Sequence, residues 1–303
     1  MAFVPGWQPS YATAARAAVE ADNGYVRVRS TAKAKGVPVS MSRFRRRFLN
    51  QGQVGTCHEH AATQFAETFA NANGRASFDV CRNLIGWQGQ TIMGSPGRNP
   101  AGGGSPTANL QGMTAESGKG VGIAHETLWP YHDNARSCGA DPPDRVLSDA
   151  KPFSLTSIVD VQGFDDLDVL LENQHPACLA IWWPAYWDTQ GGTIFDGIGG
   201  GSYGHALCIT GKVPPGVFDQ SARRFYQIEN SHDEIYAPLA ADLAAKVPGY
   251  KPSSPGKTSD FWVPEDKLRT VMGYGNAELV SATDLAGFPE LYTLADVLAS
   301  PLG

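Results

Sequence analysis

A glycine-punctuated loop that leads directly into an amphipathic helix constrains this chain more than any other stretch. The sequence NQGQVGTCHEHAATQFAETF places Ala61, Phe65 and Phe69 four residues apart. This spacing predicts a helix with one buried face, and Thr56 is a suitable N-cap residue for it. Cys57 then takes the first helical position, where the partial positive charge of the helix end stabilises a thiolate. The sequence therefore predicts a nucleophilic cysteine with a lowered pKa, although a lone cysteine is more often a small buried residue.

Two later segments contain the residue types that a cysteine nucleophile requires. His205 opens the apolar run ALCIT, which a glycine closes and which is typical of a buried strand. Asn230 ends a second segment with alternating apolar residues, FYQIEN. A nucleophile of this kind needs a base, and the base needs a residue that orients it. Cys57, His205 and Asn230 could therefore form one catalytic set, although each could also be a residue of the core or of a turn.

The order Cys, His, Asn along the chain resembles that of the papain-like cysteine peptidases, the C1 family. Residues 167–181 resemble the helix-then-strand segment that is common in bacterial and viral members of this family. In that family a glutamine six residues before the nucleophile provides the oxyanion hole, the histidine opens a strand, and the asparagine begins an Asn-Ser pair. Gln51, His205 and Asn230 stand at the matching positions. The resemblance spans about residues 37–270.

The resemblance implies an α+β fold of two lobes, one helical and one built as a β-barrel-like lobe of antiparallel strands, with the active site in the cleft between them. The peptidase domain would comprise residues 37–274, with the helical lobe at about 50–150 and the β lobe at about 151–274. Residues 1–36 would form a basic N-terminal arm and residues 275–303 a C-terminal extension. The arm is expected to be peripheral.

The resemblance also implies a cysteine-type endopeptidase that hydrolyses peptide bonds through a thioester intermediate. Cys57 would attack the carbonyl carbon, His205 would transfer protons, and Asn230 would hold the imidazole. The Gln51 side chain and the Cys57 backbone N–H would stabilise the oxyanion. A peptide or protein would be the substrate.

Two histidines depart from the family pattern. His58 directly follows the expected nucleophile and His232 follows the Asn-Ser pair, at positions where the family usually has tryptophan. The second tryptophan shields the Asn–His hydrogen bond from water, so His232 should weaken activity. His58 and His60 lie two apart on the expected helix and would point in different directions. The sequence therefore indicates neither a metal site nor a cofactor.

Other functions remain open at the level of sequence. A papain-like protein with weak or no activity could serve as a structural component of a larger assembly, for example a phage particle. An amidase or acyltransferase could use the same Cys–His–Asn site. The aromatic cluster Trp182, Trp183, Tyr186 and Trp187 favours a core position, with a wall of the cleft as the alternative.

Charge is unevenly distributed along the chain. The first 50 residues carry nine Lys or Arg and two acidic residues, about +7, while the remainder carries about −13 in a chain of net charge −6. Such asymmetry suggests a protein partner that docks on the arm. The simpler interpretations are a solvated basic face, or pairing within the chain between the acidic body and Arg43, Arg45, Arg46 and Arg47. Nucleic acid is an unlikely partner, because the whole chain is acidic and lacks a recognition motif.

Cysteine usage and the N-terminus bear on localisation. Five cysteines at irregular spacing favour free thiols, as in a protein made in a reducing cytoplasm. The first 21 residues lack the basic start and apolar core of a secretory signal. No run approaches the roughly 18 apolar residues of a membrane helix. We therefore expect neither a signal peptide nor a membrane association, and incorporation into a virion would be compatible with these features.

Overall fold

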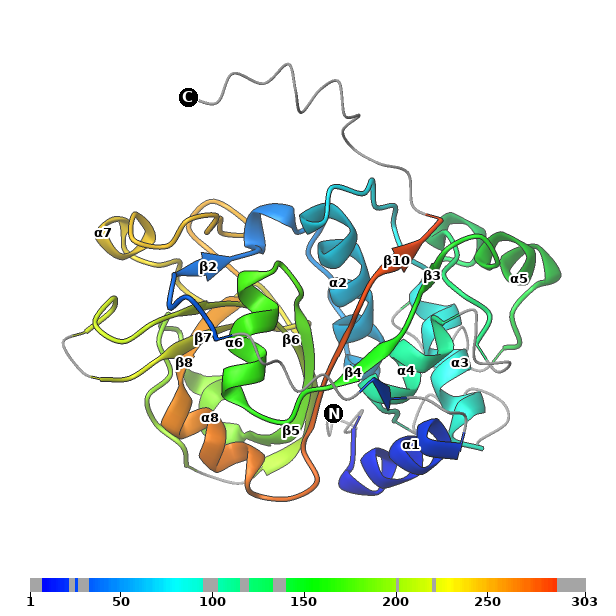
Figure 1. The fold of residues 1–303 in the computed structure, drawn as a ribbon, viewed down its shortest axis with the longest axis horizontal. Helices are drawn as coiled ribbons and strands as arrows, with labels where there is room; N and C mark the ends of the chain where they lie inside the picture. Colours follow the sequence, from blue (N-terminus) through cyan, green and yellow to red (C-terminus); the bar gives the residue numbers. More distant parts are fainter. Residues whose placement is uncertain are drawn as a thin grey trace, which may run out of the picture.

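The computed structural model describes residues 7–21, 25–26, 33–94, 103–114, 120–132, 140–199, 202–219 and 222–287. Within these residues, a group of helices lies beside a large sheet, and two further helices lie against that sheet (Figure 1). No helix of this described part is both long enough and apolar enough to cross a membrane. The α+β class expected from the sequence is confirmed.

The helical lobe is built around one long helix, which begins at Cys57 as predicted. The helices of this lobe are α1 (Pro9–Ala21), α2 (Cys57–Ala72), α3 (Arg82–Ile92), α4 (Pro106–Gly112) and α5 (Asp144–Ala150). Phe65 and Phe69 of α2 share a core with Ile85 of α3 and Leu110 of α4. The small side chains of Ala62, Ala66 and Ala70 belong to the same core, and the helix is buried as far as Ala70.

The sheet is mostly antiparallel and is open, with no closed barrel among the described strands. Its strands are β1 (Tyr25–Val26), β2 (Val39–Ser40), β4 (Ile158–Asp160), β5 (Ala177–Pro184), β6 (Ser202–Val213), β7 (Phe225–Glu229), β8 (Asp260–Pro264) and β9 (Glu278–Ala282). They follow the order β1-β4-β9-β5-β6-β7-β8, with β2 paired to β6 and only β1–β4 parallel. A separate pair consists of β3 (Ser154–Leu155) and β10 (Leu285–Ala286).

Strand β6 divides two cores, because successive side chains of a strand point to opposite faces. Leu207 and Ile209 point into a core that also contains residues of α6 (Phe164–Glu172) and α8 (Glu265–Met272). Ala206 and Cys208 point the other way, into the clusters that contain α2 residues. The strand therefore joins the two lobes. The remaining short elements are α7 (Ala241–Ala244) and the 3-10 turns at Ser42–Phe44, Glu126–Leu128 and Ala185–Thr189.

Both ends of the described chain belong to the body of the protein. Trp7, Ala15 and Val19 are fully buried, and α1 packs against α4. The expectation of a peripheral arm is thus wrong for residues 7–21, because the small alanine side chains of α1 allow close packing on the helical lobe. Residues 278–282, expected in a C-terminal extension, form β9 between β4 and β5. Residues 27–32 and 288–303 lie outside the described residues.

The densest part of the basic segment is paired within the chain. Arg45 lies buried against Glu229 and Asp260, with 2.5 Å to the Asp260 carboxylate. Arg46 pairs with Asp79 at 2.5 Å. Arg47 bridges two further carboxylates, Glu67 at 2.9 Å and Glu126. For these three arginines the simpler interpretation, pairing with the acidic body, is confirmed, and a partner that docks on them remains an untested expectation.

Candidate active site

Cys57 stands where the N-terminal end of α2 meets strand β6. Backbone N–H groups of His58 and Ala206 lie within hydrogen-bonding reach of its sulfur, so the thiol is beside the strand position that follows His205. Cys57 is fully buried, and this burial raises the pKa of its thiol to about 12. The expected lowered pKa is therefore wrong for this conformation, because lost hydration of the thiolate outweighs the helix end and the nearby amides.

The predicted capping of α2 is also different in detail. Thr56 does occupy the N-cap position, but its side chain makes no capping hydrogen bond. Its hydroxyl lies 2.8 Å from the Tyr131 hydroxyl, which in turn donates to the Gln51 carbonyl oxygen at 2.9 Å. Tyr131 thus fixes the loop that precedes the nucleophile, at the expense of a side-chain cap.

His205 and Asn230 come together as the sequence suggests. Nε2 of His205 lies 2.8 Å from Oδ1 of Asn230. The Asn230 amide oxygen faces the ring, because Oδ1 also accepts from the Ser231 backbone N–H at 2.8 Å. At its other end, Nδ2 donates to the Tyr236 hydroxyl at 2.7 Å. Nε2 of His205 therefore carries a proton and Nδ1 is left as an acceptor. Nδ1 is buried and has no hydrogen-bond partner among the described residues.

Two aromatic side chains enclose the His205 imidazole. The His232 ring stacks on it at 4.4 Å with an interplanar angle of 25°, and Trp183 meets it edge-on at 5.0 Å. Burial, and after it the neighbouring His232, lower the pKa of His205 well below its ordinary value, against the opposing effect of the hydrogen bond that His205 donates to Asn230. Burial also lowers the pKa of His232. Imidazole and thiol are thus both neutral in this conformation, and the ring at position 232 covers one face of the His205 imidazole.

Gln51 links the two lobes beside this site. Its backbone N–H donates to the Ser231 carbonyl oxygen at 2.8 Å, and its Oε1 accepts from the Ser231 hydroxyl at 2.6 Å. One N–H of its amide donates to the Val54 carbonyl oxygen at 3.0 Å. An amide nitrogen carries two hydrogens, so the second is available for a developing oxyanion. Gln51 and Asn230 are held by the same serine, since Ser231 N–H also donates to Asn230 Oδ1 at 2.8 Å.

His58 and His60 point into different surroundings, as predicted from their spacing. Nδ1 of His58 lies 2.8 Å from Nδ2 of Asn109 on α4. His60 contacts the Thr56 carbonyl oxygen through Nδ1 at 2.9 Å and Arg82 of α3 through Nε2 at 3.1 Å. The described residues contain no cluster of three or more side chains suited to a metal ion.

Two positioning residues were missed at the level of sequence. Tyr236 follows Asn230 by six residues in a segment without helical or strand periodicity, so no local pattern marks it. Ser231 was noted only as part of the Asn-Ser pair, although it contacts both Asn230 and Gln51. These roles depend on which segments meet in the folded chain, and a single sequence does not reveal that.

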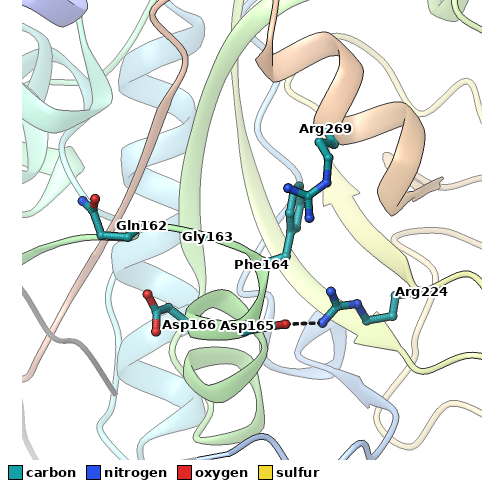
Figure 2. Close-up of a pocket in the computed structure, with 7 residues that line it drawn as sticks. All are labelled: Gln162, Gly163, Phe164, Asp165, Asp166, Arg224 and Arg269. Carbon is teal, nitrogen blue, oxygen red and sulfur yellow. Dashed lines mark hydrogen bonds and ion pairs between the residues drawn. The ribbon is translucent and has the colours of Figure 1, made fainter. Parts of the chain in front are cut away.

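Two hollows in the surface differ in their relation to these residues. One of about 510 Å³ lies between α6 and α8 (Figure 2), and its Arg224 already donates to Asp165 at 2.8 Å. None of the candidate catalytic residues lines it. The other, of about 420 Å³, adjoins His205 through His232 and Tyr203. Its remaining lining residues are Asn50, Gly52, Gln53, Asp188 and Asp233.

Comparisons with known proteins support this architecture. No protein-family profile and no curated protein sequence matches the chain. Among solved structures, xylellain, a cysteine protease from Xylella fastidiosa, is similar with a TM-score of 0.61 and 17% identity over 86% of this chain and 95% of that chain. Procathepsin B S9 from Trypanosoma congolense has a TM-score of 0.61 and 12% identity over 95% and 87% of the two chains. Bromelain from Ananas comosus, solved in complex with the E64 inhibitor, has a TM-score of 0.57 and 12% identity over 81% and 98%. The chain thus has the papain-like fold.

Proposed function

We propose that this protein is a cysteine peptidase that cleaves peptide bonds with Cys57 as nucleophile. The observation that carries the proposal is the orientation of His205. Its Nε2 is bonded to Asn230, and its Nδ1 has no hydrogen-bond partner within the described ranges. The next residue, Ala206, has its backbone N–H within hydrogen-bonding reach of the Cys57 sulfur. A neutral imidazole with a free acceptor nitrogen is the base that a buried thiol requires. The cysteine proteases among the solved structures of the same fold add to its support.

In the proposed reaction His205 Nδ1 takes the proton of the Cys57 thiol as the sulfur attacks the substrate carbonyl carbon. The negative oxygen that results receives hydrogen bonds from the second N–H of Gln51 and from the Cys57 backbone, each worth about 3–4 kcal/mol in such sites. The C–N bond then breaks, the imidazolium gives its proton to the leaving amine, and a thioester remains. Water, deprotonated by His205, cleaves the thioester and restores the thiol.

Labelling with the epoxysuccinyl inhibitor E64 tests this function without a known substrate. We expect one inhibitor per chain, attached to Cys57, after prolonged incubation of the folded protein. No adduct should form in Cys57→Ser, and His205→Ala should slow its formation at least tenfold. Cys81, Cys178 and Cys208, which are buried free thiols, are internal controls. If iodoacetamide modifies Cys57 but E64 does not, the thiol is accessible but not activated, and the proposed function is wrong.

One observation favours a second candidate, a papain-like protein without peptidase activity that serves as part of a larger assembly. All four candidate catalytic residues, Gln51, Cys57, His205 and Asn230, are buried to within 1% of their surface. If these four residues stayed buried in this way, they would stabilise the fold, and no substrate could react with Cys57. The E64 experiment separates the two functions, since a permanently closed protein gains no inhibitor at Cys57.

A further inference from the structure

Two cysteines stand opposite each other in the interior of the large sheet. Cys178 of β5 is paired with Cys208 of β6 in the antiparallel register, and both strands have neighbours on either side. Both side chains belong to the core cluster on the α2 side of the sheet, and neither has exposed surface. The Cys178 thiol donates to the Ala61 carbonyl oxygen of α2 at 3.6 Å. The two thiols therefore lie on the same face of adjacent strands.

The spacing of such a pair is close to that of a disulfide. Cβ atoms of directly opposite residues in an antiparallel pair lie about 4.5–5.5 Å apart, whereas those of a disulfide lie about 3.5–4.5 Å apart. A bond between Cys178 and Cys208 therefore needs only a local approach of the two strands. That approach strains the bond, and strained disulfides are easily reduced again. The pair is thus suited to reversible oxidation rather than to a permanent cross-link.

The charges around the two sulfurs differ. Burial raises the pKa of both thiols, and for Cys178 the neighbouring Cys208 and then Glu278 raise it further. Beside Cys208 the Arg45 guanidinium acts against the effect of burial, while Asp260 adds to it. Because the thiolate is the form that reacts with an oxidant, Cys208 is the better nucleophile of the two. Since the surrounding core excludes bulky reagents, the oxidant must be small.

From this geometry we propose that Cys178 and Cys208 are a site of oxidative modification, which a small hydroperoxide such as hydrogen peroxide converts into a disulfide between β5 and β6. Cys208 is the sulfur that the peroxide oxidises, and Cys178 resolves the product. The inference goes beyond the proposed peptidase function and does not depend on it, because neither sulfur belongs to the candidate active site. The disulfide fastens β6, the strand that carries His205, to β5.

The reaction has two steps. The Cys208 thiolate attacks one oxygen of the peroxide, an S–O bond forms, the O–O bond breaks, and the departing hydroxide leaves as water with the thiol proton. The Cys178 sulfur then attacks the sulfenic acid on Cys208. The S–S bond forms, the S–O bond breaks, and the hydroxide leaves as a second water with the Cys178 proton. Two thiols are thereby oxidised to one disulfide, and one peroxide is reduced to two waters.

Peptide mass mapping of the folded wild-type protein after incubation with hydrogen peroxide tests the pair, once the remaining thiols have been blocked in urea. We expect the peptides that contain Cys178 and Cys208 to be joined, with the loss of two hydrogen atoms, and to separate again with dithiothreitol. Cys81, which lies in a different core cluster, should keep its thiol. If Cys178 and Cys208 keep their thiols in the folded protein under conditions that oxidise them in urea, the proposal is wrong. Bonds from either cysteine to other cysteines would overturn it equally.

Two single variants test the order of the two steps. Without a resolving thiol, a sulfenic acid is oxidised further to sulfinic acid. In Cys178→Ala we therefore expect Cys208 to gain two oxygen atoms, whereas in Cys208→Ala the gain at Cys178 should be at least tenfold slower. Equal rates in the two folded variants would refute the roles assigned to the two sulfurs. Since the mapping of the wild type needs no substitution, it decides on the disulfide even if a variant does not fold.

Discussion

Replacing Tyr236 by phenylalanine removes one oxygen atom from the network that holds the His205 ring. In the wild type this hydroxyl accepts from Asn230 Nδ2 at 2.7 Å, and Asn230 Oδ1 faces His205 Nε2 at 2.8 Å. All three side chains are buried, with Tyr236 only 1% exposed. No water from the surface can take the place of the lost oxygen without opening the core.

The cost can be estimated from what the change leaves behind. A buried N–H without an acceptor costs about 1–3 kcal/mol. Asn230 can avoid this cost by turning its amide group, but its Nδ2 then faces His205 Nε2, which already carries a proton. The hydrogen bond that orients the His205 ring is lost in that case. Since about 1.4 kcal/mol corresponds to a factor of ten in rate, we expect kcat/KM to fall about tenfold in Tyr236→Phe.

Tyr250 supplies a matched control. Its hydroxyl accepts from the Leu239 backbone N–H at 3.0 Å, in a cluster separate from that of His205. Tyr250→Phe should therefore lower stability by about 1 kcal/mol and leave kcat/KM unchanged. The assay is cleavage of a fluorogenic peptide, with urea unfolding for stability. If both variants keep full kcat/KM although Tyr236→Phe is destabilised, Asn230 is held well enough by its other contacts and the reasoning is refuted.

Three further outcomes follow from the same structure. The His232→Trp variant should cleave peptide faster, and the acidic limb of its pH–rate profile should lie at lower pH, because a neutral ring replaces one whose protonation opposes that of His205. Identical profiles would show that His232 does not affect catalysis. Burial holds the pKa of His205 below its ordinary value, so as pH falls below about 6.5 the unfolded chain binds a proton that the folded chain does not, and stability is lost toward the folded pKa. The melting temperature should hence fall more between pH 7 and pH 5 in the wild type than in His205→Gln, whereas equal slopes would contradict the depressed pKa. Arg45→Ala leaves two buried carboxylates unpaired and should lower the free energy of unfolding, measured with urea, by about 3–5 kcal/mol. Arg46→Ala removes an exposed pair and should lower it by at most about 1 kcal/mol. Similar losses in the two variants would argue against an effect of burial.

Helix and strand positions could be predicted where one periodicity dominates. Local periodicity predicts a helix at 57–72, which is α2 itself, and a strand at 177–183, which lies within β5. It also predicts a helix at 77–87, but α3 begins only at Arg82, because the backbone N–H of Val80 donates to Glu67 and that of Cys81 to Ala124. A local sequence pattern does not predict such contacts between distant segments.

The sequence also favours a helix at 109–119, stopped by Gly120, but the helix in the structure starts earlier, at a signal that local reasoning overlooked. α4 begins at Pro106, and the Ser105 hydroxyl accepts from the Ala108 N–H at 3.3 Å. A serine followed by a proline is a strong start signal for a helix. The helix itself ends at Gly112 and not at residue 119, because Thr114 forms a bridge to Leu155. Residues 115–119 lie outside the described residues.

For the candidate site, the sequence indicated the residue types and their order but not their electrostatic state. Gln51, His205 and Asn230 do join one hydrogen-bonded network through Ser231. The burial that raises the pKa of Cys57 depends on the whole set of side chains packed around it. One of them, Trp7, is fifty residues away in sequence, and nothing in the local pattern of either segment connects the two.

The position of β9 sets the order in which this protein can mature during synthesis. β9 is made after every other strand of the large sheet, yet it lies between β4 and β5. Until Ala282 has left the ribosome, β4 and β5 lack the strand that lies between them. We expect Cys57, synthesised early, to remain without a functional base until almost the whole chain is available. A chain that ends at residue 274 should accordingly fail to fold, as measured by urea unfolding and near-UV circular dichroism. A cooperative transition in that chain would show that the sheet forms without β9.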